Sequence, residues 1–350
     1  MRIMLPSALV EHFHHHARDC DKLGSPFTAR LCRLLPDLLD ESTATGNRVI
    51  RWSGNPRAAA LALRLTGGLH ALALDGNPVL KAVYPPNELG DAALAEAIRK
   101  TIASDDAFLD AYLDSAPQTN EVGRSGMLLP GFLTIARETG LPLAINEIGS
   151  SAGLNLVFDQ FRYDYGSKTW GDADSPVKLA PEARGGPPPL DGDLVIASRA
   201  GSDIAPIDIE NGTQRRRLLS YVWADQALRF ERIEAAIGLA RRAGISVERA
   251  DAAEFVRERL AERKHGEAFV LFHSIMWQYL PQSSKEGVHA ALAEAGKSAT
   301  ADAPIARLRM EPLGEAPHAT LSMTLWPGGE TRRLANCDYH GRWIEWTGPV

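Results

Sequence analysis

The residues best suited to chemistry in this chain of 350 residues lie in the glycine-rich segment EIGSSAGLN at residues 147–155. Gly149 and Gly153 allow a ligand to approach the backbone closely, and Glu147 places a carboxylate two residues before the first glycine. An acid at this point suits a cationic or amino-bearing ligand better than a pyrophosphate. We therefore predict a strand, a turn and a helix start over residues 141–155 that hold a small molecule, with S-adenosylmethionine as the expected cofactor.

The spacing of these glycines differs from that of a dinucleotide site. The dinucleotide fingerprint needs G-x-G-x-x-G, whereas this segment has G-x-x-x-G, with Ser151 where a central glycine often sits. NAD and FAD are therefore disfavoured. A turn that binds no ligand remains an alternative, because two glycines alone are a weak signal.

Two further acids follow the next two predicted strands. Asp203 comes after the apolar residues 193–201, where an acid can bind ribose hydroxyls, and Asp251 comes after residues 245–250, near the expected position of an adenine. Either aspartate could equally be the N-cap of a helix. We include both in the cofactor site, together with Asn155 and with Arg124, whose guanidinium could pair with a ligand carboxylate.

Candidates for catalysis lie in FVLFHSIMWQYL, residues 269–280. The apolar part predicts a central strand that is buried on both faces. His273 and Ser274 stand at its end, where His273 is a candidate general base and Ser274 a candidate cofactor contact. Tyr279 is a second catalytic candidate that could line the substrate pocket. A hydrogen-bonded core histidine is the alternative for His273.

Within the glycine-rich segment, GSSAG at residues 149–153 also satisfies G-x-S-x-G, the nucleophile elbow of α/β hydrolases. Ser151 would be the nucleophile, with Asp251 and either His273 or His318 as its partners. No HGGG-like oxyanion segment precedes the motif, so we keep the hydrolase as an alternative.

The composition and charge of the chain limit the classes of partner that it is expected to bind. The formal net charge is −6 and the sequence holds no long basic run, which argues against nucleic acid and favours a small-molecule substrate. Three scattered cysteines and the absence of a signal or membrane-spanning pattern predict a soluble, cytoplasmic protein. His12, His16 and Cys20 are spaced as on one face of a helix, but nearby carboxylate ligands are few, and we predict no metal site.

The elements that must position these residues fall into two regions. Residues 1–135 show helical spacing of apolar side chains and predict a helical N-terminal cap. Residues 136–350 alternate strands and helices, which predicts an α/β domain with a mostly parallel sheet that ends in an antiparallel hairpin formed by residues 319–326 and 341–346. A Gly-, Pro- and Asp-rich insert at about 161–190 is expected to be a lid or a flexible excursion over the ligand crevice.

From residue 141 onward the chain resembles the class I S-adenosylmethionine-dependent methyltransferases. That resemblance implies a Rossmann-like fold and transfer of a methyl group. About 50 residues separate the glycine turn from Asp203, against roughly 20 in such folds. The residues that match the family's motifs are Glu147, Gly149 and Gly153 in the first motif, Asp203 and Asp251 as the two acids, and His273 and Ser274 after the fourth strand.

A second resemblance extends over most of the chain. The strings NEVGR (120–124), EIGSSAGLNL (147–156), RYDYG (162–166), VWADQ (222–226) and FHSIMWQYL (272–280) are similar to those of the bacterial domain-of-unknown-function family 2332. The family's chemistry is not settled, so this resemblance implies no activity. Three functions are carried forward: a methyltransferase acting on a small molecule, an α/β-hydrolase-type serine esterase that uses Ser151, and a ligand-binding protein without turnover.

Overall fold

The computed structural model describes residues 5–314 and 316–349. The chain forms two compact units: one runs up to Thr119 and takes in Asn211–Glu231, and the other comprises Asn120–Glu210 and the chain from Arg232 onward. In the described part of the chain, no helix is long and apolar enough to cross a membrane.

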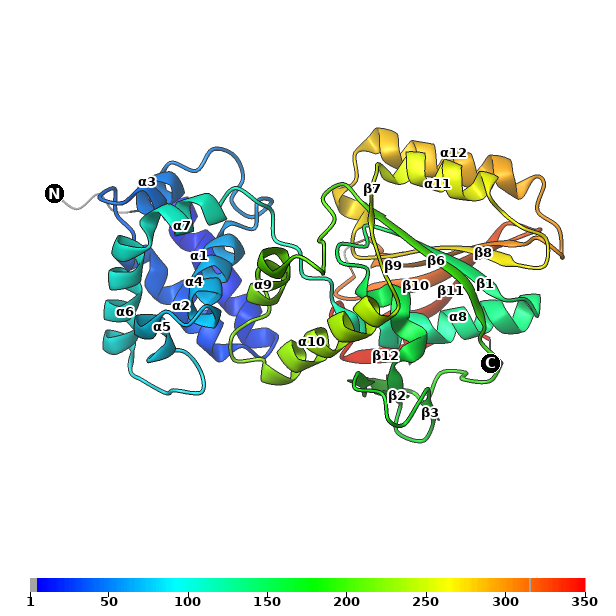
Figure 1. The fold of residues 1–350 in the computed structure, drawn as a ribbon, viewed down its shortest axis with the longest axis horizontal. Coiled ribbons are helices and arrows are strands. Elements are labelled where there is room, and N and C mark those ends of the chain that lie inside the picture. The colour runs from blue at the N-terminus through cyan, green and yellow to red at the C-terminus, as the bar shows by residue number, and fades with distance from the viewer. Residues whose placement is uncertain (1–4, 315, 350) are drawn as a thin grey trace. The chain divides into compact units, whose positions relative to one another are not determined.

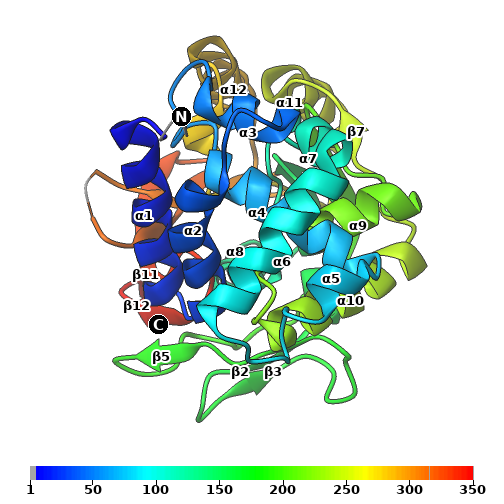
Figure 2. The ribbon, with the colours of Figure 1, turned by 90° about the vertical axis from the view of Figure 1, so that its left-hand side faces the viewer.

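The first unit consists of helices around α4, and its described residues contain no strand. Three leucines of α4, Leu61, Leu65 and Leu69, have no exposed surface, so this helix forms the centre of the unit's core. Helix α1 packs along α2, and α4 contacts α2, α7 and α9 (Figure 2). The helices are α1 (Ser7–Lys22), α2 (Pro26–Leu38), α3 (Ala44–Ile50), α4 (Leu61–Leu74), α5 (Pro78–Lys81), α6 (Asp91–Ser104), α7 (Asp106–Tyr112) and α9 (Gly212–Ser220).

The units do not divide where the sequence suggested. The helical cap was expected to end at residue 135, but α8 (Ser125–Thr139) belongs to the second unit and α9 to the first. Helix α10 (Ala227–Arg242) lies in the first unit up to Glu231 and in the second from Arg232.

The second unit is an α/β fold with a nine-stranded, mostly parallel sheet (Figure 1). Its strand order is β5-β12-β11-β10-β9-β8-β1-β6-β7. The five strands from β9 to β7 are parallel to one another, whereas β9 to β12 are joined by antiparallel pairs. The strands are β1 (Leu143–Ile148), β5 (Glu182–Arg184), β6 (Ile196–Asp203), β7 (Glu248–Arg249), β8 (Ala268–Ser274), β9 (Ile305–Pro312), β10 (Ala319–Trp326), β11 (Glu330–Cys337) and β12 (Trp343–Trp346).

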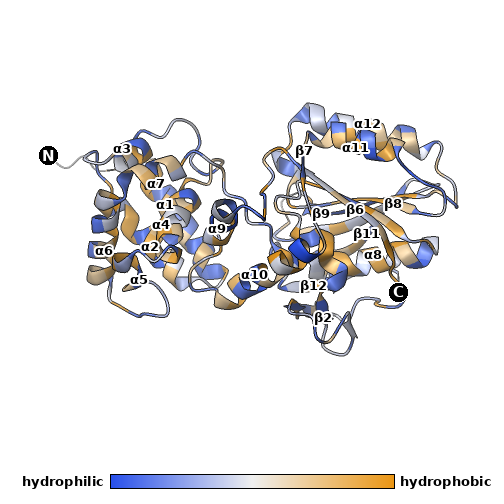
Figure 3. Cartoon of the chain, viewed as in Figure 1, coloured by the Kyte–Doolittle hydropathy of each residue, from blue (hydrophilic) through white to orange (hydrophobic). Residues whose placement is uncertain are grey.

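Helices cover both faces of this sheet (Figure 1). Helices α11 (Ala252–Ala261) and α12 (Gln282–Gly296) pack their apolar side chains on Phe269 and Leu271 of β8. Helix α8 lies on the other face, where Phe132 contacts the ring of Phe272. Strand β8 is buried at all seven residues, as its continuous apolar run predicts, and Figure 3 shows hydrophobic colour along the sheet and the inner sides of these helices.

The predicted terminal hairpin was wrong in its partner strand. The turn at residues 327–329 joins β10 to β11, and β12 pairs with the far side of β11. Strand β11 (ETRRLANC) was missed because its first four residues are all charged or polar, so no alternation of apolar side chains marks it as a strand. The third strand of the predicted series, β7, is only two residues long.

The insert at about 161–190 is folded. It forms a small sheet of β2 (Arg162–Asp164), β3 (Thr169–Trp170) and β4 (Lys178–Leu179), and then supplies β5 to the main sheet beside β12. Tyr163 and Tyr165 are buried and donate hydrogen bonds to the carbonyls of Phe158 and Gly126, each at 2.6 Å. These aromatic anchors attach the insert to α8 and to the segment after β1, so the expectation of a flexible excursion was wrong.

The predicted helix after the glycine turn was also wrong. Residues Leu154–Gln160 form a kinked 3-10 segment with a non-helical Val157. The side chain of Asn155 points inward and accepts a hydrogen bond from Ser125 at 2.7 Å, which ties the segment to the start of α8. A ligand at this turn would therefore meet backbone N–H groups of the turn but no α-helix dipole.

Candidate functional site

The candidate site lies at the carboxyl ends of β1, β6 and β8. From β1 the chain runs outward through β6 and β7, then returns to place β8 on the other side of β1. In open α/β sheets, ligands bind beyond the strand ends at such a reversal of strand order. Glu147 near the end of β1, Asp203 at the end of β6 and Ser274 at the end of β8 all face this edge.

The Glu147 carboxyl group is the most unusual group at this edge. The side chain is 2% exposed, and burial raises the pKa of Glu147 to about 8, against smaller lowering effects of Ser150 and Arg124. Its Oε2 atom is buried and finds no hydrogen-bond partner in the part of the chain that the structure describes. The group is therefore mostly neutral at pH 7, and it would need a cation or a donor from outside to become a stable carboxylate.

The backbone of the glycine turn is left-handed at three alternate residues, with φ of +66° at Gly149, +55° at Ser151 and +71° at Gly153. A Cβ atom on Gly149 would lie 2.7 Å from Met276 Cε, and one on Gly153 would lie 2.7 Å from Ile245 Cγ2. Gly153 is thus required for packing against the segment before β7, whereas Gly149 faces the residues that follow β8.

Two side chains hold the turn in place. The Asp203 carboxylate accepts hydrogen bonds from the backbone N–H of Ser151 and of Ala205, each at 2.9 Å. The amide oxygen of Asn120 accepts from the N–H groups of Ala152 and Leu154 at 3.2 and 3.0 Å. Asp203 therefore positions the turn, and a role in ribose binding would be additional, since a carboxylate has about four acceptor sites.

Arg124 was expected to pair with a ligand carboxylate, and the string that contains it, residues 120–124, borders the turn. Asn120 of this string fastens the turn. Arg124 donates hydrogen bonds to the carbonyls of Tyr339 (3.0 Å) and Ser274 (3.2 Å), and so links β8 to the loop between β11 and β12. Its positive charge lies close enough to Glu147 to lower the pKa of that carboxyl group.

Backbone strain concentrates at this edge. Among the described residues of the second unit, three non-glycine residues have positive φ: Asn120 (+31°), Ser151 (+55°) and Ile275 (+52°). Asn120 is bonded to the turn that contains Ser151, and Ile275 directly follows β8. A β-branched residue in this conformation is a marked outlier, and such strain collects at ligand sites and switch regions.

His273, the candidate general base, is fully buried and has both ring nitrogens occupied. Nδ1 lies 2.7 Å from Glu311 Oε1 and Nε2 lies 3.1 Å from Arg307 Nη2. Arginine can only donate, so Nε2 accepts and the ring proton sits on Nδ1. Burial lowers the pKa of His273, partly against the effect of Glu311. This geometry matches the alternative of a core histidine, and we do not propose His273 as a base.

The remaining candidates are scattered. Tyr279 is 74% exposed, and Asp251 caps α11 by accepting from the N–H of Ala253 at 2.8 Å and from Ser284 Oγ. Ser151 Oγ is buried, and no described group forms a hydrogen bond with it. The triad suggested for a hydrolase is therefore not joined by hydrogen bonds, because Asp251 and His273 are engaged elsewhere.

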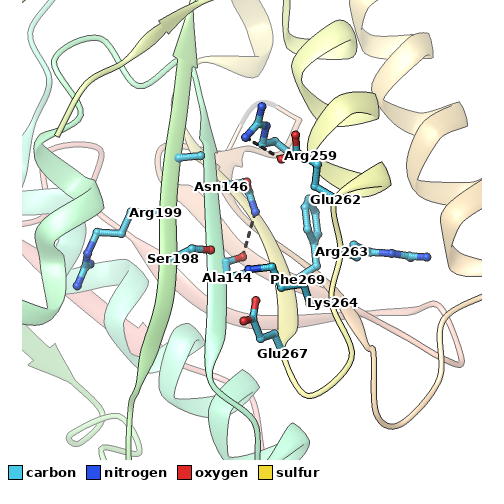
Figure 4. A pocket seen from close by; sticks show the side chains of 11 residues that line it. Ala144, Asn146, Ser198, Arg199, Arg259, Glu262, Arg263, Lys264, Glu267 and Phe269 are labelled. Atoms are coloured by element: carbon cyan, nitrogen blue, oxygen red, sulfur yellow. Dashed lines mark hydrogen bonds and ion pairs between the residues drawn. The ribbon is translucent and has the colours of Figure 1, made fainter. Parts of the chain in front are cut away.

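A groove of about 400 Å³ lies away from these residues, between β1, β6 and the end of α11 (Figure 4). Figure 4 shows the amide of Asn146 donating to the carbonyl of Ala144, and Arg259 paired with Glu262. None of the predicted site residues lines it. Four basic and two acidic side chains line it, but Arg199 is paired with Asp159 and Arg259 with Glu262, and we assign the groove no ligand. Within the described ranges, no group of three or more His, Cys, Asp or Glu side chains is placed to hold a metal ion.

The comparison that identifies the chain is with protein families. The family described as "Uncharacterized protein conserved in bacteria (DUF2332)" matches residues 10–346, which is nearly the whole sequence. The chain belongs to the DUF2332 family. No curated protein and no solved structure matches it.

In this DUF2332 member, four of the five strings noted in the sequence lie in the α/β unit, and the fifth lies in the helical unit. Residues 120–124 and 147–156 are joined by the hydrogen bonds of Asn120, and residues 272–280 meet them through Arg124. Residues 162–166 anchor the insert through Tyr165. Residues 222–226 lie in the helical unit instead, where they contact the turn between α1 and α2.

Proposed function

We propose that this protein binds S-adenosylmethionine at the edge formed by β1, β6 and β8 and transfers its methyl group to a small molecule. The main support is the buried Glu147 carboxyl group with its unpartnered Oε2 beside a left-handed turn. The ligand's ammonium group would supply the missing partner. Burying a carboxyl group without a partner costs free energy, which ligand binding would recover.

The strand order gives further support. Across the sheet, five neighbouring strands lie in the order β7, β6, β1, β8, β9. When these five are numbered by their order along the chain, the sequence is 3-2-1-4-5, the arrangement of Rossmann-like folds, and the glycine turn lies at the reversal. The antiparallel strands β10 to β12 extend the sheet beyond β9. The fit is incomplete at the helix after β1, which is a 3-10 segment here.

The residues that would hold the cofactor are Glu147 for the ammonium group, the backbone of Gly149 and Ser151 for close contact, and Asp203 for the ribose hydroxyls. The cofactor would supply a methyl group activated by a sulfonium. Positioning of the acceptor provides much of the rate in such a transfer, so a general base is not required. This is consistent with the occupied ring nitrogens of His273.

Isothermal titration of the full chain with S-adenosylmethionine, with its demethylated product and with NAD tests the proposal. We expect binding of the first two ligands and none of NAD. Glu147→Gln should weaken binding at least about tenfold, because removing a buried charge partner costs more than 1.4 kcal/mol. Lack of binding to the first two ligands, or full affinity in the double variant Glu147→Ala and Asp203→Ala, would overturn the assignment. Labelling of Ser151 by a fluorophosphonate would favour the hydrolase instead.

Proton release gives a more specific prediction. Because the pKa of Glu147 is about 8 in the free protein, the group is mostly protonated at pH 7 and must ionise to pair with an ammonium group. Binding at pH 7 should release about 0.9 proton from this site, and affinity should rise close to tenfold per pH unit between pH 6 and 7. Titrations in buffers of different ionisation enthalpy measure this release. Equal heats in all buffers would exclude the proposed ion pair.

A further inference from the structure

The sheet has a polar face where β9, β10 and β11 lie side by side. Cross-strand partners in a sheet point to the same side. Arg307 of β9 donates a hydrogen bond to His289 of α12 at 3.3 Å, so its side of the sheet is the one that carries α12, whereas Leu308 points to Gly131 of α8. The residues of this polar face are Arg307, Arg309 and Glu311 of β9, Thr320, Ser322 and Thr324 of β10, and Thr331, Arg333 and Asn336 of β11.

The centre of the polar face is a line of hydroxyl groups between two arginines. Ser322 pairs across the strands with Arg309 on one side and with Arg333 on the other. Arg309 Nε donates to Ser322 Oγ at 2.8 Å, and Arg333 Nη2 donates to Asn336 Oδ1. Arg309 is half-buried and Arg333 is exposed. Each guanidinium group is thus held at one nitrogen and keeps further N–H groups for a ligand.

The arginines of the polar face lack a carboxylate partner. Arg307, Arg309 and Arg333 form no ion pair with a carboxylate of the described residues. Arg332, the neighbour of Arg333 on the other side of the sheet, pairs with Glu138 at 2.5 Å. The missing counter-charge is therefore a property of this face and not of the strand.

Two carboxylates on or beside the polar face do not neutralise its three arginines. Glu311 Oε1 is occupied by three donors, and Glu345 accepts a hydrogen bond from Asn336 at 2.7 Å. The pKa of Arg307 is lowered to about 10 by burial and, secondly, by the charge of Arg309, against the effect of Glu311. An anion bound here would relieve this repulsion between like charges.

Three polar atoms of the same face are buried and have no hydrogen-bond partner among the described residues. They are Thr320 Oγ1, Glu311 Oε2 and Arg307 Nε, and the three residues are at most 8% exposed. Thr320 and Glu311 are direct cross-strand partners, which places their Cβ atoms about 5 Å apart. Buried polar groups are normally paired, so a hydroxyl donor and a carboxylate acceptor side by side indicate a group supplied from outside.

We propose that the polar face binds the phosphate group of a small phosphomonoester that also carries a hydroxyl group. Arg309, Arg333 and Thr320 each donate to one phosphate oxygen, and Glu311 Oε2 accepts from the ligand's hydroxyl. A phosphomonoester has three acceptor oxygens and a charge of about −1.5 to −2 at pH 7, which matches three donors on a positive face. A carboxylate offers two oxygens and one charge, and fits less well.

This phosphate site is separate from the site of the proposed methyl transfer. Glu147 pairs across β1 and β8 with Phe272, whose ring contacts Phe132 of α8. The Glu147 carboxyl group therefore lies on the α8 side of the sheet, and the polar face lies on the α12 side. Binding of a phosphomonoester does not depend on S-adenosylmethionine, and either proposal can fail without the other.

Isothermal titration of the full chain with glycerol 3-phosphate at low ionic strength tests the proposal. We expect binding that weakens as salt is added, because the two guanidinium groups are accessible to solvent. Propyl phosphate, which lacks the hydroxyl groups, and lactate, which replaces phosphate by carboxylate, should each bind at least about fivefold more weakly. No binding of glycerol 3-phosphate, or lactate binding as tightly, would overturn the phosphate site. Equal binding of propyl phosphate would remove the role of Glu311.

Variants locate the site. Arg309→Gln and Arg333→Gln should each weaken binding of glycerol 3-phosphate at least about tenfold, whereas Arg332→Gln, with the same change of charge on the other side of β11, should keep the affinity within about twofold. Equal losses in all three would mean attraction to net charge alone and overturn the proposal. Thr320→Val removes a hydroxyl that has no partner, so it should not lower the melting temperature but should still weaken binding. Full affinity in this variant would contradict the site even if the arginine variants do not fold.

Discussion

Replacing Glu147 with glutamine is expected to stabilise the protein by about 3 kcal/mol at pH 7 and nearly 5 kcal/mol, as an order-of-magnitude figure, at pH 9. The pKa of this carboxyl group is raised from 4.5 to about 8 by burial. A group with a raised pKa contributes its full stability below pH 4.5 and loses it as the pH rises through 8. Glutamine resembles the protonated acid and does not titrate, so its advantage should be near zero at pH 4.5 and grow above that.

Urea unfolding at pH 4.5, 7 and 9 measures this difference. Glu258 on α11 offers a control, because it is exposed, and Glu258→Gln should change the free energy of unfolding by no more than about 0.5 kcal/mol at any of these pH values. A Glu147→Gln variant that is no more stable than the unmodified protein at pH 9 would show that Glu147 ionises without penalty. The argument for a missing cationic partner would then fail.

The stability gain expected for Glu147→Gln bears directly on the proposed function. Natural proteins retain a destabilising group mainly where it serves a ligand or a reaction. We expect Glu147→Gln to gain stability and lose affinity for S-adenosylmethionine together. The two measurements are independent, so a gain in stability with unchanged affinity would keep the burial argument and remove the cofactor assignment.

Replacing Glu311 with glutamine is expected to have the opposite effect and destabilise the protein by about 3–5 kcal/mol. Glu311 Oε1 accepts hydrogen bonds from His273 Nδ1 and from the N–H groups of Met276 and Trp277. Its charge also faces the buried Arg307, whose pKa burial lowers to about 10. The amide would weaken all three hydrogen bonds and leave this guanidinium without its nearby negative charge.

The same urea experiment at pH 7 tests this second prediction, with Glu147→Gln as the matched comparison. Both variants change a buried carboxyl group to an amide in the same sheet, but only Glu311 has three donors. We expect shifts of opposite sign. A neutral or stabilising Glu311→Gln would mean that the desolvation of this buried network outweighs its hydrogen bonds, and that His273 owes little of its position to Glu311.

The local patterns of the sequence were informative about the sheet. The strands β1, β6, β8, β10 and β12 were predicted, because their apolar runs or alternations are visible within a few residues. Strand β11 and the fold of the insert were not predicted. The first four residues of β11 are all charged or polar, and the insert's tyrosines are buried by segments outside the insert. The short kinked segment after β1 was mistaken for a helix because its apolar spacing is helical.

The features of the candidate site also divide into those that the sequence predicted and those that only the structure showed. From the sequence alone came the glycine turn, the acid before it and the strings of residues around it, because each is a contiguous pattern. Only the tertiary structure decided that Glu147 Oε2 is buried without a partner among the described residues, so that the carboxyl group is mostly neutral at pH 7, and that His273 is held between Glu311 and Arg307. The physical reason is that charge state and pKa depend on burial and on partners brought together from distant parts of the chain, which no local pattern records.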